Sequence, residues 1–484
     1  MTAASILIVF GAYTLTLFIL GYVTSRKSDD EAFYLGSRSS KWYLVAYGMV
    51  GASLSGVTFI SVPGYVGSSS FSYMVLVFGY LAGYIVIANV LLPVYYKLKL
   101  TSIYSYLNQR FGMASHKTGS AYFILSRLIG ASFRVYIVVN VLYLFVFQHW
   151  GVPFEAVVVL FVTLILLYSI RGGIKTIVIT DTLQTTFMLI AIITSVVLLS
   201  ASWSGGVREM ATEIMQSDYS KMFYFTEWKD RNFFLKLFFS GMFITIVMTG
   251  LDQDMMQKNL SCRTYRESRK NMYWMSAMLI PVNFLVLFLG ASLFLYAEKQ
   301  GIAIPVMTDD LFPTITLTVL GGIAGITFLL GLIAAAYSSA DGTLTALTTS
   351  FTIDILRLPD KKTLTPQRRT HYRRLVHIGF TLLVIGAIML FGAINDKAVI
   401  EKLFDIAGYT YGPLLGMFAF GLFTRLKVRD HIVPIIAVLS PVLAYLTKYL
   451  WETWVEGYHV GFEILIINGL ITFMLLLAIT RWKK

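Results

Sequence analysis

Long apolar segments recur about thirteen times along this chain, and they restrict its fold more than any other feature of the sequence. Each approaches the roughly 20 residues that a helix needs to cross a hydrocarbon core of about 30 Å. Hydrophobic residues make up 57% of the 484 residues and charged residues only 13%, well below the roughly 25% of soluble domains. We therefore expect an all-α polytopic membrane protein with about thirteen transmembrane helices in a lipid bilayer.

The expected transmembrane helices cover residues 4–24, 43–66, 71–96, 119–147, 152–170, 176–201, 233–256, 271–297, 314–352, 371–393, 401–424, 432–449 and 458–481. The first lacks a basic leading region and a small-residue cleavage site, so it is expected to be retained rather than removed as a signal peptide. The ninth is too long for one crossing and is expected to tilt or to extend beyond the membrane. The connection 202–232 is expected to be a surface loop with an interfacial helix.

The basic residues are divided unevenly between alternate connections. With the N-terminus outside, 28 of the 39 lysines and arginines fall on the cytoplasmic side and nine outside, while Arg127 and Arg134 lie within the fourth helix. Cytoplasmic loops are enriched in basic residues, so we expect an outside N-terminus and a cytoplasmic C-terminus. The net charge of +13 is spread over these loops, which argues against a nucleic-acid partner.

An enzymatic function finds no support in the residues. The single cysteine, Cys262, excludes a disulfide framework and a cysteine-based metal site. The six histidines show no metal-ligand spacing, and no phosphate-binding loop occurs. We therefore expect no catalytic residues and a protein that is not an enzyme.

Two glycines flank two serines in the middle of the second expected helix. Gly51 and Gly56 enclose Ser53 and Ser55, and Thr58 follows. Glycine favours local unwinding, which would free backbone carbonyls for a cation and aim the helix ends at a substrate. Close helix packing through small residues explains the pattern equally well.

Oxygen-bearing side chains are concentrated in little more than one turn of the ninth expected helix. Ser338, Ser339 and Thr343 supply hydroxyls, and Asp341 supplies a carboxylate. Hydroxyls that bond to carbonyls one turn earlier explain the serines and the threonine but not Asp341. The cluster therefore favours a site for a hard cation such as Na⁺.

Two further polar features lie inside expected helices, where charged side chains are costly and usually functional. Asp181, near the start of the sixth helix, could bind a cation, accept a proton or cap the helix, and capping is the strongest of the three interpretations. Arg134 could bind a carboxylate through paired hydrogen bonds or pair with Asp181 or Asp341. Arg127 could extend to the membrane interface.

Several segments in order resemble the sodium/solute symporter family, which includes sodium/glucose, proline, iodide and sialic acid transporters. They are Gly51–Gly64, Lys97–Ser102, Asn108–Phe111, Ile179–Gln184, Ala335–Ser339 and Ser350–Asp354. The resemblance implies a LeuT-type fold with two inverted five-helix repeats, at 43–201 and 233–424. An extra N-terminal helix with its linker would occupy 1–42, the extracytoplasmic loop 202–232, and two extra helices 425–484. Gly250–Asp254 would mark an interruption of the seventh helix.

The resemblance also implies two ion sites. The main sodium site would use the carbonyls of Gly51, Leu54 and Ala335 with the hydroxyls of Ser338 and Ser339. A second cation site, present in some relatives, maps onto Asp181, Ser338, Asp341 and Gly342. Where those relatives have serines this chain has Asp341 and Gly342, so a second Na⁺ and a proton on one of the two aspartates both stay open.

The substrate residues implied by the resemblance are Ser53, Ser55, Thr58, Tyr73 and Arg134. They are similar to the pattern of bacterial sialic acid transporters, although Val77 stands where that pattern has a glutamine. The sugar transporters of the family have an amide at Thr58 and a lysine in the eighth helix, where this chain has Met278, Leu279 and Ile280.

The expected function is therefore secondary active transport, in which Na⁺ drives symport of a small polar solute by alternating access. The favoured substrate is an organic anion such as a sialic acid or another carboxylate, with a sugar or an amino acid as alternatives. A proton-coupled symporter and a passive channel are the rival functions.

Overall fold

The chain folds into a bundle of α-helices. The computed structural model describes residues 3–25, 30–361, 363–394 and 399–480, and within these ranges extended structure is limited to two isolated bridge pairs. Nine helices of the described chain are long and apolar enough to cross a membrane, and a bent pair makes a tenth. Three shorter apolar helices complete the set, so each of the thirteen expected spans contains at least one helix. The expectation of an all-α polytopic membrane protein is confirmed.

The helices in chain order are α1 (Ala3–Ser25), α2 (Asp30–Leu35), α3 (Trp42–Leu54), α4 (Gly56–Ser69), α5 (Tyr73–Val86), α6 (Leu92–Lys97), α7 (Ser105–Arg110), α8 (Met113–Leu142), α9 (Phe154–Ser200), α10 (Gly206–Gln216), α11 (Phe234–Thr245), α12 (Gln253–Leu260), α13 (Tyr265–Gln300), α14 (Leu311–Pro313), α15 (Gly322–Ser350), α16 (Pro366–Ile394), α17 (Val399–Phe423), α18 (Val433–Trp454) and α19 (Ile464–Ala478).

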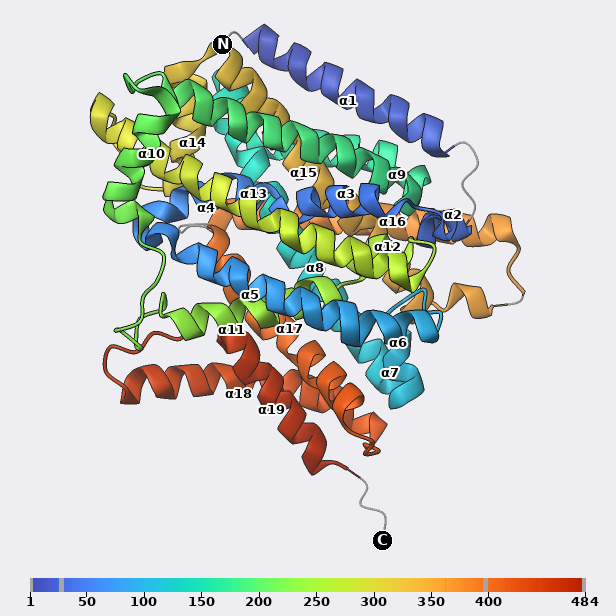
Figure 1. Ribbon diagram of the computed structural model, residues 1–484. Helices are drawn as coiled ribbons and strands as arrows, with labels where there is room; N and C mark the ends of the chain where they lie inside the picture. Colours follow the sequence, from blue (N-terminus) through green and yellow to red (C-terminus); the bar gives the residue numbers. More distant parts are fainter. Residues whose placement is uncertain (1–2, 26–29, 362, 395–398, 481–484) are drawn as a thin grey trace.

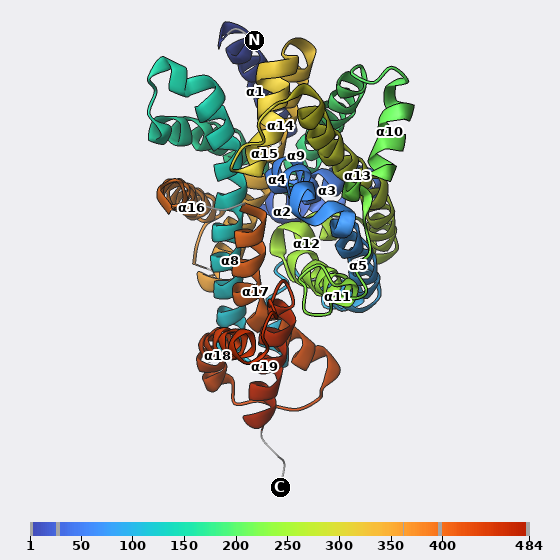
Figure 2. The same cartoon turned by 90° about the vertical axis from the view of Figure 1, so that its left-hand side faces the viewer.

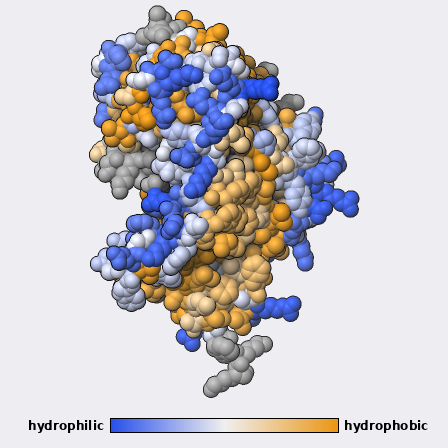
Figure 3. Space-filling model, turned by 60° about the vertical axis from the view of Figure 1, so that its left-hand side comes forward, coloured by the Kyte–Doolittle hydropathy of each residue, from blue (hydrophilic) through white to orange (hydrophobic). Residues whose placement is uncertain are grey.

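The terminal helices lie at opposite edges of the bundle. Figure 1 and Figure 2 both place α1 at the upper edge and α18 with α19 at the lower edge. Large apolar side chains on the outer helices are exposed, such as Ile8 on α1 at 70% and Ile435 on α18 at 65%. Figure 3 shows a hydrophobic band flanked on both sides by hydrophilic residues, as expected for a surface that contacts lipid tails between two aqueous faces.

The second expected helix is interrupted at one residue. α3 ends at Leu54 and α4 begins at Gly56, while Ser55 between them has φ 25° and ψ 172°. Gly51 also lies so close to α9 that a Cβ at this position would overlap the Thr185 side chain. Local unwinding and close packing, the two interpretations of this glycine pattern, therefore both hold.

The seventh expected helix is interrupted as the resemblance implied. A π-helical turn, Ile246–Gly250, follows α11, and Asp252 caps α12 by accepting a hydrogen bond from the Met255 backbone N–H at 3.2 Å. The two halves differ in direction by 65°. Asp252 is thus a helix cap, a role that the sequence had suggested for Asp181.

The ninth expected helix, 314–352, is divided into two segments, in agreement with the expectation that it is too long for one crossing. Residues Thr314–Leu320 form a π-helical turn, and α15 begins at Gly322. Gly321 and Gly322 have φ of 55° and 46°, values that glycine adopts without a steric penalty. A glycine pair therefore ends one segment and lets the next start in a new direction.

The connection 202–232 contains the amphipathic helix α10, as expected for an interfacial element. Met210 and Ile214 of this helix are buried, while most of its remaining residues are exposed or half-buried. The basic residues from Arg481 onward, which contributed to the topology count, lie outside the described residues.

A sharp turn at Gly173 divides α9 into the fifth and sixth expected spans, and it gives a direct test of the fold. Gly173 has φ 59° and ψ −163°, and an added Cβ would overlap the backbone of Phe33. We expect Gly173→Ala to destabilise the protein by at least the roughly 1–3 kcal/mol typical of a strained non-glycine backbone. Thermal unfolding in detergent, followed by intrinsic fluorescence, measures the change.

The matched control is Gly386→Ala on α16, where the glycine is exposed and no atom lies within 4 Å of an added Cβ. Alanine favours a helix interior over glycine by about 1 kcal/mol, so this variant should melt at the wild-type temperature or slightly above it. Equal melting temperatures for the two variants would contradict the proposed turn.

Candidate functional site

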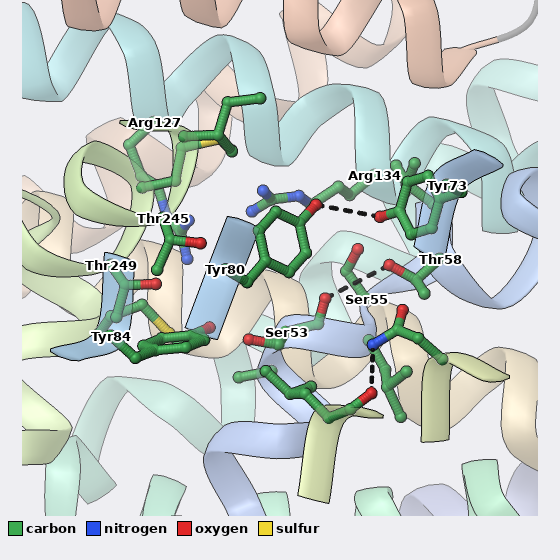
Figure 4. A pocket seen from close by; sticks show the side chains of 18 residues that line it. Ser53, Ser55, Thr58, Tyr73, Tyr80, Tyr84, Arg127, Arg134, Thr245 and Thr249 are labelled. Atoms are coloured by element: carbon green, nitrogen blue, oxygen red, sulfur yellow. Dashed lines mark hydrogen bonds between the residues drawn. The ribbon is translucent and has the colours of Figure 1, made fainter. Parts of the chain in front are cut away.

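A cavity of about 90 Å³ lies beside the break between α3 and α4 (Figure 4). Its lining residues are Ala52, Ser53, Leu54, Ser55, Val57, Thr58, Tyr73, Tyr80, Tyr84, Arg127, Arg134, Ile244, Thr245, Met248, Thr249, Met255, Leu279 and Asn283. All five residues expected to bind substrate are in this set. The structure therefore brings together side chains from α3, α4, the break between them, α5 and α8, and the outermost, Ser53 and Arg134, lie 81 positions apart in the chain.

One wall of the cavity carries hydroxyl groups. Figure 4 shows Tyr73 and Tyr80 directed toward each other, and their hydroxyl oxygens are 3.2 Å apart. The Thr58 hydroxyl donates to the carbonyl of Ser53 at 3.4 Å, across the break in the helix. Val77, the position of the glutamine in the sialic acid transporter pattern, is buried and does not line this cavity.

Two arginines of α8 face the cavity with different partners. Arg127 donates through Nη2 to Asp254 Oδ2, and its Nη1 lies 3.4 Å from Asp252 Oδ2. Arg127 is therefore fixed inside the protein, and the interpretation that it extends to the membrane interface is wrong. Arg134, two turns later, forms no ion pair within 4 Å with any carboxylate that the structure describes, and its Nε is buried without a hydrogen-bond partner.

The carboxylates considered as partners of Arg134 bind other groups. Asp181 Oδ2 lies 2.8 Å from Lys258 Nζ, and Asp181 Oδ1 accepts a hydrogen bond of 2.8 Å from the Ser338 hydroxyl. Asp341 accepts a hydrogen bond of 2.6 Å from the Tyr168 hydroxyl. Asp181 lies about two turns inside the second half of α9, so the helix-capping interpretation is wrong.

The residues expected at the main sodium site come from two helices in contact, α3 and α15. Gly51 and Leu54 lie in the last turn of α3, next to its break. Ala335 lies about one turn before Ser338 and Ser339 on α15, and all three are at most 3% exposed. The Ser339 hydroxyl has no hydrogen-bond partner among the described residues, so its oxygen is free to contact an ion.

The residues mapped onto the second cation site are also brought together. Ser338 on α15 bonds to Asp181 on α9, and Asp341 follows less than one turn later on α15. A Cβ added to Gly342 would lie 2.5 Å from Asp254 Oδ1. The Asp254 carboxylate therefore occupies the space in which the relatives' pattern places a serine side chain.

Sequence reasoning missed several residues of this region. Lys258 had been counted with the cytoplasmic loop, but its side chain is 1% exposed and ion-paired. Lys258 follows Asp254 by four residues, directly after the interruption of the seventh helix. This spacing places the two side chains on one face of a helix, and it was the available sequence signal for their ion pair. The other missed side chains line the cavity from α5, α11, the π-helical turn after α11, and α13, none of which carries a distinctive motif there. They are Tyr80, Tyr84, Thr245, Thr249 and Asn283.

Comparisons with known proteins agree with this geometry. Residues 33–428 match the sodium:solute symporter family. The sodium/sialic acid symporter SiaT of Proteus mirabilis is 26% identical and aligns with 90% of this chain and 88% of its own length. The sodium-coupled monocarboxylate transporter 1 of Mus musculus is 25% identical, over 82% of this chain and 64% of that protein.

The fold is similar to that of a solved Na⁺-coupled sialic acid symporter in a substrate-bound, outward-open state, with a TM-score of 0.83, 21% identity and coverage of 97% of this chain and 96% of that one. The nucleobase-cation-symport-1 transporter MHP1 gives a TM-score of 0.57 at 13% identity, with 92% of both chains covered. The family match extends over most of the chain, and it includes both interrupted helices and the cavity between them. The chain therefore belongs to the sodium:solute symporter family and is an integral membrane transporter, not an enzyme, that couples movement of a small solute to Na⁺.

Proposed function

We propose that this transporter takes up a small organic carboxylate, such as a sialic acid, together with Na⁺. The observation that carries the proposal is the guanidinium of Arg134, which lines the cavity without an ion-pair partner among the described residues. Arg134 is half-buried and its Nε has no hydrogen-bond partner in the described part of the chain, and a charge that is withdrawn from water is unfavourable unless it is paired. A substrate carboxylate would supply that pairing, through two parallel N–H···O hydrogen bonds.

Apart from Arg134, the cavity lining suits a substrate whose remaining part is both polar and apolar. Hydroxyls of Ser53, Ser55, Thr58 and Tyr73 can bond to substrate hydroxyl or amide groups. Ile244, Met248 and Leu279 provide apolar contacts on another wall. A neutral sugar is less suited to the cavity because Leu279, among the residues that replace the lysine of the sugar transporters, cannot donate a hydrogen bond.

The main sodium site is proposed at the carbonyls of Gly51, Leu54 and Ala335 and the hydroxyls of Ser338 and Ser339. Five neutral oxygens from an unwound helix end and a second helix suit a hard monovalent cation. The contact between α3 and α15 and the unpartnered hydroxyl of Ser339 support this assignment.

Coupling follows from the position of this site. The substrate would contact Ser53 and Ser55 at the break of α3, while Na⁺ would contact the carbonyls of Gly51 and Leu54 in the same last turn. An ion that holds α3 against α15 stabilises the conformation in which the cavity is formed. Substrate and ion then favour the same conformation, so each raises the affinity of the protein for the other. Movement of the helices opens the site to the other side and releases both.

The proposed orientation places the N-terminus outside and the C-terminus in the cytoplasm of a bacterium, in the plasma membrane. The excess of basic residues in the connections on one side supports it. The connection between α9 and α11, which contains α10, would then face the outside.

Proton coupling is the second candidate function. Asp341 is fully buried and accepts its hydrogen bond from Tyr168 rather than from a cationic side chain, so a proton could neutralise it. A passive channel is the third, and accumulation of substrate against its gradient distinguishes a symporter from it.

Arg134→Gln tests the substrate class. In liposomes with an imposed Na⁺ gradient, the wild type should take up radiolabelled N-acetylneuraminate or lactate in preference to the corresponding methyl ester. Removal of the guanidinium should reduce this preference at least tenfold, because hydrogen bonds to charged groups contribute about 1.5–3 kcal/mol.

The control for this variant is Asn283→Ala, which also changes the cavity lining but leaves the charge in place. It should weaken uptake of acid and ester in equal proportion. An Arg134→Gln protein that still prefers the acid would overturn the carboxylate proposal. Sodium-dependent uptake of neutral sugars by the wild type in the same assay would then identify a sugar as the substrate.

Ser338→Ala and Ser339→Ala test the main sodium site. Each removes one oxygen ligand, so the Na⁺ concentration that gives half-maximal uptake should rise about tenfold, which corresponds to roughly 1.4 kcal/mol. Uptake measured over a series of Na⁺ concentrations at constant ionic strength gives the value.

Thr343→Val is the matched control on the same helix, because the Thr343 hydroxyl already donates to the Ser339 carbonyl at 2.7 Å and is not among the proposed ligands. Its Na⁺ dependence should stay within twofold of the wild type. If both serine variants also keep the wild-type dependence, the sodium site lies elsewhere.

A further inference from the structure

We propose that the ammonium group of Lys258 is a built-in cation at the second ion position, so that this transporter binds one Na⁺ per chain, at the main site. The inference rests on the proposed sodium site and deepens it by assigning the ion stoichiometry. It also assigns a role to a residue that the sequence had placed in a cytoplasmic loop.

Lys258 lies where a second cation would be expected. Its Nζ is 2.8 Å from Asp181 Oδ2 and 3.3 Å from Asp254 Oδ1, and the side chains of all three residues are at most 1% exposed. Asp181 also accepts the hydrogen bond from Ser338. The ammonium therefore contacts the carboxylate that anchors the mapped second site, and it supplies the positive charge that a Na⁺ would bring.

The differences between this chain and its relatives in α15 are consistent with a resident ammonium. Gly342 leaves room for Asp254, whose carboxylate would lie 2.5 Å from a Cβ at that position. Asp254 in turn binds both Lys258 and Arg127. The space of a neutral hydroxyl ligand is thus filled by a carboxylate that holds the lysine in place.

Lys258 supplies the counter-charge of Asp181 in a region that is rich in buried carboxylates. Four carboxylates, Asp181, Asp252, Asp254 and Asp341, are buried in this region, and each is at most 1% exposed. Lys258 and Arg127 provide two cations in direct contact with three of them. Removal of the lysine would leave Asp181 without an ion-pair partner, and a buried anion of this kind attracts a mobile cation.

A resident ammonium has a consequence for the transport cycle. Lys258 is on α12, Asp181 on α9 and Ser338 on α15, so the ion pair and the Ser338 hydrogen bond together join three helices. A covalently attached cation cannot leave with the substrate. The second position would therefore contribute to the packing of these helices but not to the driving force, and only the ion at the main site would move.

The test is the number of ²²Na⁺ ions bound by purified protein in detergent, measured by scintillation proximity without any substrate. The wild type should bind one ion per chain, and Ser339→Ala should remove most of this binding at the same Na⁺ concentration. Lys258→Met should bind two, because Asp181 and Asp254 become available to a second Na⁺. Two ions in the wild type, or one in a folded Lys258→Met protein, would overturn the inference.

The matched control is Lys236→Met on α11, which removes another ion-paired lysine, 3.6 Å from Glu463 and 10% exposed, outside the proposed site. It should still bind one ion. If Lys258→Met does not give a monodisperse protein, Asp341→Asn in the wild-type background decides. If Lys258 occupies the second position, the Asp341→Asn protein should still bind one Na⁺ per chain. If Na⁺ occupies that position in the wild type, the variant should bind fewer ions than the wild type.

The two proposals fail in different ways. Wild-type protein that binds no Na⁺, or whose single ion is insensitive to Ser339→Ala, contradicts the main sodium site. Wild-type protein that binds two ions, one of them sensitive to Ser339→Ala, keeps the main site and rejects the role of Lys258.

Discussion

Backbone polar groups cannot remain unpaired in a hydrocarbon core, and the rest of this structure depends on that constraint. Non-helical backbone is tolerated at membrane depth only where it lies inside the protein or lines a polar cavity. The chain interrupts its helices at Ser55 and at Gly250–Asp252, and the neighbouring side chains line one cavity. The proposed binding site therefore lies where the helices are broken, because these are the places with free carbonyl and amide groups to offer a ligand.

A network of buried charges surrounds this cavity and gives its two arginines different roles. Arg127 is held by Asp252 and Asp254, and Lys258 by Asp181 and Asp254. Ion pairs of this kind add little net stability, although loss of one partner is strongly destabilising. Their contribution is to fix α8, α9 and α12 relative to one another. Arg134 stands outside the network, and its charge remains available for a substrate.

The same arrangement explains how an ion and an organic solute can depend on each other. α3 supplies carbonyls on one side of its break and hydroxyls at the break itself, so one short segment contacts both ligands in the proposed sites. α15 supplies the opposing hydroxyls and is buried along nearly all of its length from Phe328 onward. A ligand that stabilises the contact between these helices changes the affinity for the other ligand, and thermodynamic linkage makes the effect reciprocal.

The sequence by itself determined the membrane location, the approximate positions of the apolar helices and the interruption at Gly51–Gly56, because hydrophobic length and glycine placement are local properties of the chain. Family resemblance implied the interruption at Gly250–Asp254 and the five cavity residues. Only the tertiary structure decided the partners of the buried charges. Asp181 binds Lys258 and Ser338 rather than capping a helix, and Arg127 and Arg134 differ although they lie on the same helix. These pairings join residues about 80 to 160 positions apart, and the pattern along one helix carries no information about which charge on another helix lies opposite.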